Sequence, residues 1–590
     1  MSKLFSHKII SIINWIVLGL LFLTTLVFRF RWLDLMPSGL NWDEASYGYN
    51  AYSLMKTGVD EWGEKYPLFL KSFGDYKPAL LSYLQIPFIK LSGLNEIAIR
   101  MPIAILGLMS LISWFFIQKK LNLFSSKQKS LLLAIGTVLL AAMPWHIHYS
   151  RAAMDPMVSF SFLLMGYVLF LQKRKFFQWL GLFLLMLSMY TYNSARIFGF
   201  LLICAHIFFI ETDLFFQYKK RLNRLFQIIT VGAFFIIIIL LSLFTKIGAR
   251  AQDVFVLSSK QITNDVNESL YRSTVLKMEG PRVFSNKLIT SSYVLAKNYL
   301  SHFDLGFLYF DGNLSARHGF SRHGNLLLVT LPFLILGIFS SRFKSKDERF
   351  FAAWLLLAPL AAMLSDDVPH SGRTLIMLPA YVYFITKGIE SFLNLMTSKI
   401  KIWQISKEIS KEISLTAILI FLSFNTLLYF VDMYRYFPEE SFAPWQADAK
   451  KVVQKLQQIN TGSYDQVYVS KEVLESYIFY AFYNSLDPEI IQKKLNNNDE
   501  NRFENIQILD ENECYLLQPN SLLISQNVYV GTSINNNVEQ ETNKHLFTET
   551  IFSLERFDHK QPIAYIYETN KISKNELIDL ELRCQITKKP

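Results

Sequence analysis

Residues 9–28 read IISIINWIVLGLLFLTTLVF, a run without a charged side chain. A helix of this length is about 30 Å long, which matches the hydrocarbon core of a bilayer. The run lacks a small-residue cleavage site and continues into Phe28-Arg29-Phe30-Arg31-Trp32, which favours a retained helix over a cleaved signal peptide. Similar runs predict about eleven spans, near residues 9–28, 97–117, 130–146, 156–171, 176–192, 196–211, 225–245, 325–341, 349–364, 373–390 and 413–432.

The composition agrees with a polytopic α-helical membrane protein. Only 18% of the 590 residues are charged, against about 25% in soluble proteins. Fifty Phe and 29 Tyr suit lipid contact and interfacial belts. The net charge of +11 comes from Lys and Arg in alternate short loops between the apolar runs, which argues against nucleic acid as a partner.

The basic loops also predict the orientation of the chain. With eleven spans, all of them fall on one side, which the positive-inside rule makes the cytoplasm. The N-terminus is then cytoplasmic, and segments 31–96 and 246–324 and the tail lie outside a prokaryotic plasma membrane. The basic loops occupy residues 119–129, 173–175, 219–224, 342–349 and 399–411.

The chain changes character after the last span. Short apolar strands at 466–469, 522–525 and 564–567 alternate with helical and Asn-rich stretches. This pattern predicts a small extracytoplasmic α/β domain over 433–590, following a transmembrane domain over 1–432.

The outer segments hold most of the polar clusters that suggest chemistry. Asp43 and Glu44 are adjacent carboxylates a short distance after the first span, where such a pair is costly unless it is solvated or used. Other clusters are Gly74-Asp75-Tyr76-Lys77-Pro78, Arg100, Tyr149-Ser150-Arg151 with Asp155, Tyr192-Asn193-Ser194-Ala195-Arg196, and Asp366-Asp367-Val368-Pro369-His370-Ser371-Gly372-Arg373.

Carboxylates facing arginines and lysines fit glycosyl transfer from a lipid phosphate. A carboxylate can take the proton of an acceptor hydroxyl as it attacks the anomeric carbon. The departing phosphate is already anionic and needs positive charge and hydrogen-bond donors rather than an acid. The sequence contains neither a Walker-type loop nor a Gly-x-Gly-x-x-Gly loop for soluble nucleotides.

The order and sidedness of these motifs resemble the C-type glycosyltransferases (GT-C fold), in the protein O-mannosyltransferase and lipid A aminoarabinose transferase branch. The resemblance covers roughly residues 9–432 and includes the outer segment from Asn298 through His302 to His318. One departure is Ala79, because the lysine motif of the family often reads Lys-Pro-Pro, whereas here Pro78 is followed by alanine.

The resemblance implies a role for each matching residue. Asp43 would be the general base and Glu44 its partner in positioning the acceptor. Lys77, Arg100, Arg196 and Arg373 would bind the donor phosphate, and the sugar would transfer with inversion. The residues that would shape the site are Asp155, Tyr76, His302 and His370.

Plainer interpretations remain open for several of these residues. Lys77 can extend to the interface, and Arg100 and Arg196 can anchor span ends. Asp155 precedes Pro156 and can cap a helix. His146 with His148, or Asp366 and Asp367 with His370, could hold a divalent ion, but neither has the ligand set of a clear site, so no cofactor is expected to be essential.

The implied partners are a polyprenyl-phosphate-linked sugar, membrane lipids and an acceptor that is a lipid, an envelope polymer or an exported protein. An oligosaccharide transferase or polymer ligase is the alternative, although the Trp-Trp-Asp signature of oligosaccharyltransferases is absent from the tail. A transporter or flippase fits less well, because the span interiors are almost free of ionisable residues and no internal repeat is found. A scaffold would leave the outer charges unexplained.

Overall fold

The computed structural model describes residues 2–124, 128–211, 218–244, 255–258, 260–276, 285–313, 315–399, 407–497, 499, 501–509, 520–525, 549–552 and 562–568. The chain divides into two compact units. Unit 1 comprises Met1–Leu33, Phe69–Leu81 and Arg100–Phe437. Unit 2 comprises Asp34–Leu68, Ser82–Ile99 and Pro438–Pro590.

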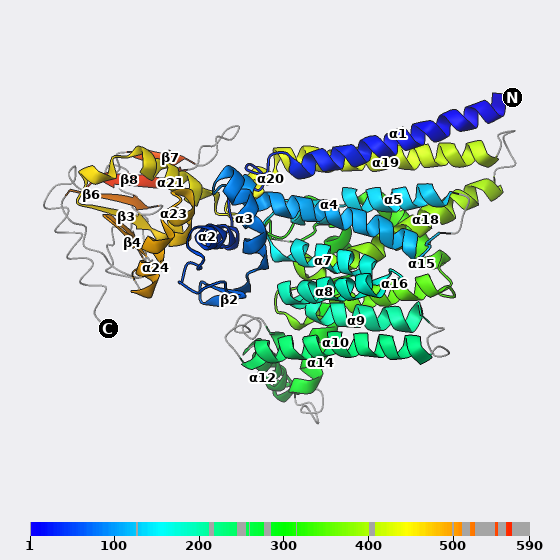
Figure 1. The fold of residues 1–590 in the computed structure, drawn as a ribbon, viewed down its shortest axis with the longest axis horizontal. Coiled ribbons are helices and arrows are strands. Elements are labelled where there is room, and N and C mark those ends of the chain that lie inside the picture. Colours follow the sequence, from blue (N-terminus) through cyan, green and yellow to red (C-terminus); the bar gives the residue numbers. More distant parts are fainter. Residues whose placement is uncertain are drawn as a thin grey trace. The chain divides into compact units, whose positions relative to one another are not determined.

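Unit 1 is built mainly from helices (Figure 1). They are α1 (Ser2–Phe30), most of α4 (Glu96–Lys120), α5 (Lys129–Ala142), α6 (Pro144–Tyr149), α7 (Asp155–Phe170), α8 (Lys175–Thr191), α9 (Asn193–Phe209), α10 (Tyr218–Phe244), α12 (Lys260–Val275), α14 (Lys287–Ser301), α15 (Leu331–Ser340), α16 (Lys346–Leu357), α17 (Ser371–Thr374), α18 (Leu378–Lys399) and α19 (Lys407–Arg435). Short 3₁₀ turns lie at Val256–Ser258, Leu328–Thr330, Ala358–Leu360, Ala362–Leu364 and Leu375–Met377, with a π-helical turn at Gly306–Phe310.

The protein is an integral membrane protein. Within the described residues, four helices are long and apolar enough to cross a bilayer: Lys8–Phe30, Glu96–Lys120, Leu222–Phe244 and Glu408–Arg435. Shorter apolar helices occupy Lys129–Ala142, Asp155–Phe170, Asn193–Phe209 and Leu328–Ser340. The long helices begin and end close to the predicted runs, while the total of eleven spans stays a prediction.

Small residues let the helices of unit 1 approach closely. A Cβ added to Gly166 of α7 would lie 2.7 Å from the Gly181 carbonyl oxygen of α8. Gly337 in α15 and Gly388 in α18 are packed equally closely. A Cβ added to either glycine would meet backbone atoms of the other helix. Helices inside a bilayer gain little from hydrophobic exclusion, so close backbone packing of this kind holds them together.

Helices α1 and α19 lie side by side (Figure 1). Phe28 stacks on Phe430 with ring centroids 4.0 Å apart. Nearer the other end, the Asn14 side-chain amide donates to Glu412 Oε2 over 2.7 Å. The pairing therefore joins the beginning of the chain to its last apolar helix.

A short hairpin follows the first loop of the chain. β1 (Phe69–Ser72) pairs antiparallel with β2 (Asp75–Pro78), with Leu70 opposite Lys77. The turn between them has positive φ at Phe73 (51°) and Gly74 (77°), a conformation in which glycine is favoured. The pairing of the two strands fixes the backbone position of Lys77 in β2.

Unit 2 is an α/β assembly. Its helices are α2 (Trp42–Thr57), most of α3 (Leu80–Ser92), most of α20 (Phe437–Glu440), α21 (Ala447–Gln458), α22 (Lys471–Leu474), α23 (Tyr477–Tyr483) and α24 (Pro488–Asn496), with a 3₁₀ turn at Thr461–Ser463. Its strands are β3 (Gln466–Ser470), β4 (Arg502–Phe503), β5 (Ile506–Leu509), β6 (Ser521–Ser525), β7 (Glu549–Phe552) and β8 (Pro562–Glu568).

These strands form one sheet in the order β4-β5-β3-β6-β8-β7. β3 is parallel to both of its neighbours, with Val467 opposite Ile506 and Leu522. Val467 and Val469 are fully buried, as expected for a strand between two others. The stretches predicted as strands at 466–469, 522–525 and 564–567 lie within β3, β6 and β8.

Helix α2, from the first predicted outer loop, folds with the tail inside unit 2. The Tyr49 hydroxyl donates to the Leu486 carbonyl over 3.1 Å, and the Gln492 amide donates to Ser53 Oγ over 3.2 Å. A Cβ added to Gly48 would lie 2.7 Å from the Phe482 ring. Close packing of this helix therefore depends on residues more than 400 positions away.

Candidate functional site

The predicted acidic pair lies in unit 2, in the first turn of α2. Asn41 caps the helix, and its side-chain oxygen accepts from the Asp43 amide over 3.0 Å. The Trp42 amide donates to Gln446 Oε1 over 2.8 Å. The helix dipole favours carboxylates in this turn. Asp43 is half-buried and Glu44 is fully buried, so the two carboxylates have different access to solvent.

Lys77 and Tyr76 lie on the hairpin of unit 1. Lys77 is 6% exposed, with its ammonium 5.1 Å from the centre of the Phe73 ring. The hairpin docks on the end of α8, because the Ala79 amide donates to the Tyr190 hydroxyl over 3.0 Å. Tyr76 is half-buried on the same strand.

Arg196 meets the same end of α8. Its Nε donates to the Met189 carbonyl over 3.3 Å, and its Nη1 donates to Ser242 Oγ over 2.7 Å. Met189 and Tyr190 are neighbours in the chain, so the hairpin that carries Lys77 and the guanidinium of Arg196 are both anchored at one helix end. The structure thus brings two of the predicted phosphate ligands to a common region of unit 1.

Arg100 lies at another place, near the end of α1. It is fully buried, and its Nη1 donates to the Leu33 carbonyl over 2.7 Å. Arg151 lies beside the same stretch of chain and donates to the carbonyls of Phe28, Arg31 (2.9 Å) and Trp32 (3.0 Å). These bonds satisfy carbonyls that the end of a helix leaves without partners.

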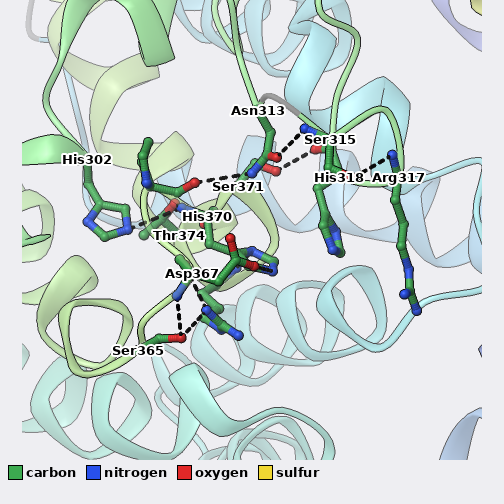
Figure 2. Close-up of polar contacts among 12 residues, drawn as sticks. His302, Asn313, Ser315, Arg317, His318, Ser365, Asp367, His370, Ser371 and Thr374 are labelled. Carbon is green, nitrogen blue, oxygen red and sulfur yellow. Dashed lines mark hydrogen bonds and ion pairs between the residues drawn. The ribbon is translucent and has the colours of Figure 1, made fainter. Parts of the chain in front are cut away.

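The late motif around His370 forms a polar cluster with two other segments (Figure 2). The His370 amide donates to His302 Nε2 over 3.4 Å, and the rings of His318 and His370 lie 4.3 Å apart. The Tyr149 hydroxyl is 2.9 Å from Ser371 Oγ and 3.3 Å from His318 Nδ1. The predicted residues His302, His370 and Arg373 are therefore close together.

The orientation of His370 is set from both sides of its ring. Nδ1 accepts from the Arg373 amide over 3.3 Å, which places the proton of a neutral ring on Nε2. Nε2 lies 3.6 Å from Asp367 Oδ2. The Asn313 amide donates to the Pro369 carbonyl over 3.2 Å and ties the turn to the preceding segment.

Burial favours the neutral form of two imidazoles of this cluster, those of His302 and His370. Burial, with a smaller contribution from the charge of Arg373, lowers the pKa of His302 to about 4. Burial and the neighbouring His318 and Arg373 hold the pKa of His370 well below its usual value. Arg317 and Arg373 thus supply the permanent positive charge of the cluster, which also contains the carboxylate of Asp367.

Arg373 is half-buried and held on one side. Its Nη1 donates to Ser365 Oγ and to the Asp367 carbonyl (2.9 Å). Within the described part of the chain, Nε and Nη2 make no hydrogen bond. The guanidinium therefore has a fixed position and retains donors for an anionic group.

Asp155 begins α7 next to this turn. A Cβ added to Gly372 would lie 3.2 Å from Pro156 Cγ and 2.9 Å from the Tyr149 hydroxyl oxygen. The turn and the start of α7 are therefore packed against each other. Asp155 is half-buried at that contact.

Sequence reasoning did not single out Ser365 and Asn313, which hold the turn from two directions. Ser365 also accepts from Asn298 through its backbone carbonyl over 3.1 Å. A single serine beside an apolar run gives no pattern to find, and only the fold reveals these contacts. Across the described residues, no group of three or more His, Cys, Asp or Glu side chains has the arrangement of a metal site.

No protein-family model and no curated protein matches the chain. Among solved structures, it is similar to ArnT from Cupriavidus metallidurans in the apo state, with 12% identity and a TM-score of 0.48 over 88% of this chain and 93% of that chain. ArnT bound to undecaprenyl phosphate matches with 12% identity and a TM-score of 0.45 over 86% and 92% of the two chains.

The archaeal oligosaccharyltransferase AglB from Archaeoglobus fulgidus, in complex with an inhibitory peptide and a dolichol-phosphate, matches with 12% identity and a TM-score of 0.43. That match covers 80% of this chain and 63% of AglB. Both proteins are C-type glycosyltransferases, the class that the sequence motifs resemble. At 12% identity, the function has to be inferred from the residues of the chain itself.

Proposed function

We propose that this protein is an inverting glycosyltransferase that moves a sugar from a polyprenyl-phosphate carrier to an acceptor at the outer face of the membrane. The observation that carries the proposal is Arg373, a half-buried guanidinium fixed through Nη1 beside neutral imidazoles, with Nε and Nη2 making no hydrogen bond to the described residues. A departing phosphate needs such preorganised donors, and arginine can bind it through two parallel bonds.

Lys77 and Arg196 support the same assignment. The hairpin that carries Lys77 is held at the end of α8 through Ala79, and Arg196 is held there through its own side chain. Both side chains are buried, so their charges are poorly screened by water. We assign them to the donor phosphate together with Arg373. Arg100 and Asp155 would shape the site, with Tyr76, His302 and His370.

The proposed reaction is a single displacement. The oxygen of the acceptor hydroxyl attacks the anomeric carbon while Asp43 takes the hydroxyl proton. The bond between that carbon and the phosphate oxygen breaks, and the electron pair leaves with the lipid phosphate, so the anomeric centre inverts. Glu44, buried one residue on, would position the acceptor.

The polyprenyl phosphate class is proposed from the membrane setting and the arginine chemistry. The carriers named with the two similar proteins, undecaprenyl phosphate and dolichol-phosphate, belong to this class. We propose that the N-terminus lies in the cytoplasm of a prokaryotic cell and the tail outside it. A reporter enzyme that works only in the cytoplasm can be fused after residue 590 to test this orientation. Activity of that reporter would contradict it.

Transfer of radiolabelled sugar from a polyprenyl-phosphate-sugar by reconstituted protein tests the activity. Asp43→Asn is expected to reduce transfer by about 1,000-fold or more, since the base is lost while the fold is kept. Asp465→Asn, which changes an exposed aspartate of the tail in the same way, is expected to retain full transfer. Full activity of Asp43→Asn would show that the base is assigned wrongly.

A further inference from the structure

The first turn of α9 is a polar feature that the assignments above leave unused. α9 packs against α8 and α10 in unit 1 (Figure 1). Its N-cap is Tyr192, whose side chain makes no capping hydrogen bond. Among the described residues, the backbone amides of Asn193 and Ser194 have no hydrogen-bond acceptor. The helix therefore begins with N–H groups that are available to a ligand, at the end where its dipole is positive.

Ser194 adds a hydroxyl to this turn. The residue is 3% exposed, and its Oγ is buried without a hydrogen-bond partner in the described part of the chain. Most buried hydroxyls are paired, because an unpaired one costs free energy. The Cα–Cβ bonds of a helix tilt toward its N-terminus, so Ser194 directs its hydroxyl to the end where the amides are unpaired. The neighbouring Asn193 is exposed, which leaves that end open to a ligand.

Arg196 provides a positive charge in the same turn. It is 6% exposed, and its Nε and Nη1 donate to the Met189 carbonyl and to Ser242 Oγ. Its Nη2 makes no hydrogen bond, and the guanidinium makes no ion pair, with any residue that the structure describes. The nearest carboxylate along the chain, that of Glu211, pairs with Arg224. A buried cation of this kind is costly unless an anion accompanies it.

The turn that carries Arg373 is packed against α9, since α17 contacts that helix. Tyr149, whose hydroxyl lies 2.9 Å from Ser371 Oγ, is also close to the N-cap of α9. Burial, with a smaller contribution from the neighbouring Tyr192, raises the pKa of Tyr149 well above its usual value. The carboxylate of this turn, Asp367, lies 3.6 Å from a histidine of the same turn. The first turn of α9 and the guanidinium of Arg373 therefore lie in one region of unit 1.

We propose that the first turn of α9 binds the phosphate of the lipid-linked sugar, with the Ser194 hydroxyl and the amides of Asn193 and Ser194 donating to its terminal oxygens beside Arg196. This inference rests on the proposed function and adds uncharged donors to the cationic ones. The donor phosphate is a diester with one negative charge, whereas the released polyprenyl phosphate is a monoester that approaches two at neutral pH.

Fixed donors at the helix end stabilise this gain of charge. As the bond between the anomeric carbon and the phosphate oxygen breaks, negative charge accumulates on the phosphate, and the donors of the turn are already in place to receive it. Ser194 is in this assignment a further catalytic residue. It also contributes to binding of the released polyprenyl phosphate.

The test measures binding of radiolabelled undecaprenyl phosphate to the full-length protein in detergent. Ser194→Ala is expected to bind it about 10-fold more weakly, because a hydrogen bond to a charged group is lost. Its melting temperature should stay the same or rise, because the hydroxyl has no partner within the described residues. Ser194→Thr keeps a hydroxyl and should restore most of the affinity. Wild-type affinity in Ser194→Ala overturns the proposal.

Controls identify the part of the lipid that is recognised. Ser341→Ala removes a buried hydroxyl that donates to the Gly337 carbonyl at the end of α15, and it should leave the affinity unchanged. Undecaprenol, which lacks the phosphate, should bind the wild type and Ser194→Ala equally. Competition by inorganic phosphate as strong as by undecaprenyl phosphate would indicate a site for the free ion and overturn the assignment to the lipid.

Transfer measured in parallel separates this inference from the proposed function. Ser194→Ala is expected to lower kcat about 10-fold, and to change kcat more than KM, because the hydroxyl acts most strongly on the departing phosphate. If the wild type transferred no sugar while Ser194→Ala still bound undecaprenyl phosphate about 10-fold more weakly, the phosphate site would stand and the proposed function would fail. Normal transfer and normal binding in Ser194→Ala would overturn this inference alone.

Discussion

Two arginines of unit 1 show how the same side chain serves two purposes. Arg151 is 1% exposed, and its donors go to the carbonyls of Phe28, Arg31 and Trp32. Arg373 is half-buried, and one of its nitrogens carries both of the side-chain hydrogen bonds it makes to described residues. Arg151 provides hydrogen-bond donors to the carbonyls at the end of a helix, while Arg373 is fixed through one nitrogen and has further N–H groups that can bind a ligand.

The comparison shows that position at a span end does not reveal a role. Sequence alone placed Arg100, Arg151, Arg196 and Arg373 alike, at or beside the outer ends of predicted spans. Their partners separate Arg151 from Arg373, because a guanidinium that donates to three backbone carbonyls stabilises the fold, and one fixed through a single nitrogen can bind a ligand. The predictions below test that separation.

Arg151→Gln should have the largest effect, and it should act on stability. Three partly buried carbonyl contacts at the end of α1 lose their charged donor, which costs about 3 kcal/mol. The melting temperature of the purified protein should fall by several degrees, with transfer per folded molecule changed little. Arg174→Gln, at an exposed arginine, serves as the control. An unchanged melting temperature would refute the structural role of Arg151.

Arg373→Gln should show the opposite behaviour. Loss of a preorganised donor to the leaving group typically slows a reaction by about 100-fold to 1,000-fold. Transfer should fall by that factor, while the melting temperature stays within about 2 °C of the wild type. Arg342→Gln is the matched exposed control. If Arg373→Gln melted early and kept its specific activity, the two arginines would not differ in role.

The cluster around Arg373 should make stability depend on pH. The pKa of His302 is near 4 in the folded protein and about 6.5 when unfolded, so the unfolded chain binds its proton first as pH falls. The stabilisation is complete above pH 6.5 and is lost progressively down to about pH 4. Melting temperatures measured between pH 7.5 and 4.5 should fall, and His302→Phe should reduce the slope. Identical slopes would exclude His302 as a contributor.

The smallest expected effect concerns the cap of α2 in unit 2. Asn41→Ala removes the acceptor of the Asp43 amide and should destabilise the unit by about 1 kcal/mol. Asn41→Ser preserves a capping oxygen and should restore most of the loss. Chemical denaturation followed by tryptophan fluorescence can measure both variants. Equal stability of the alanine and serine variants would mean that the cap contributes nothing.

The sequence was a good guide wherever structure follows from local pattern. Long apolar runs predicted the regions of α1, α4, α10 and α19, because a bilayer demands length and hydrophobicity from contiguous residues. Alternation of short apolar stretches predicted β3, β6 and β8 in the same way. The His370-Ser371-Gly372-Arg373 motif drew attention to the polar cluster before its geometry was known.

Features that depend on distant partners could not be predicted. The packing of α2 with the tail relies on contacts such as Tyr49 with Leu486, for which one sequence contains no signal. The support of Arg373 by Ser365 and the different surroundings of Arg151 are equally non-local. The fold class could therefore be predicted from residue patterns, while the different roles of the arginines could be inferred only from the structure.

Equilibrium binding of radiolabelled undecaprenyl phosphate to the purified protein tests the account most directly, because it separates holding the donor from reacting with it. Arg373→Gln is predicted to bind at least 10-fold more weakly than the wild type, whereas Asp43→Asn binds as tightly as the wild type but transfers sugar more slowly by about 1,000-fold or more. Wild-type affinity in Arg373→Gln would contradict the claim that this guanidinium receives the lipid-borne phosphate.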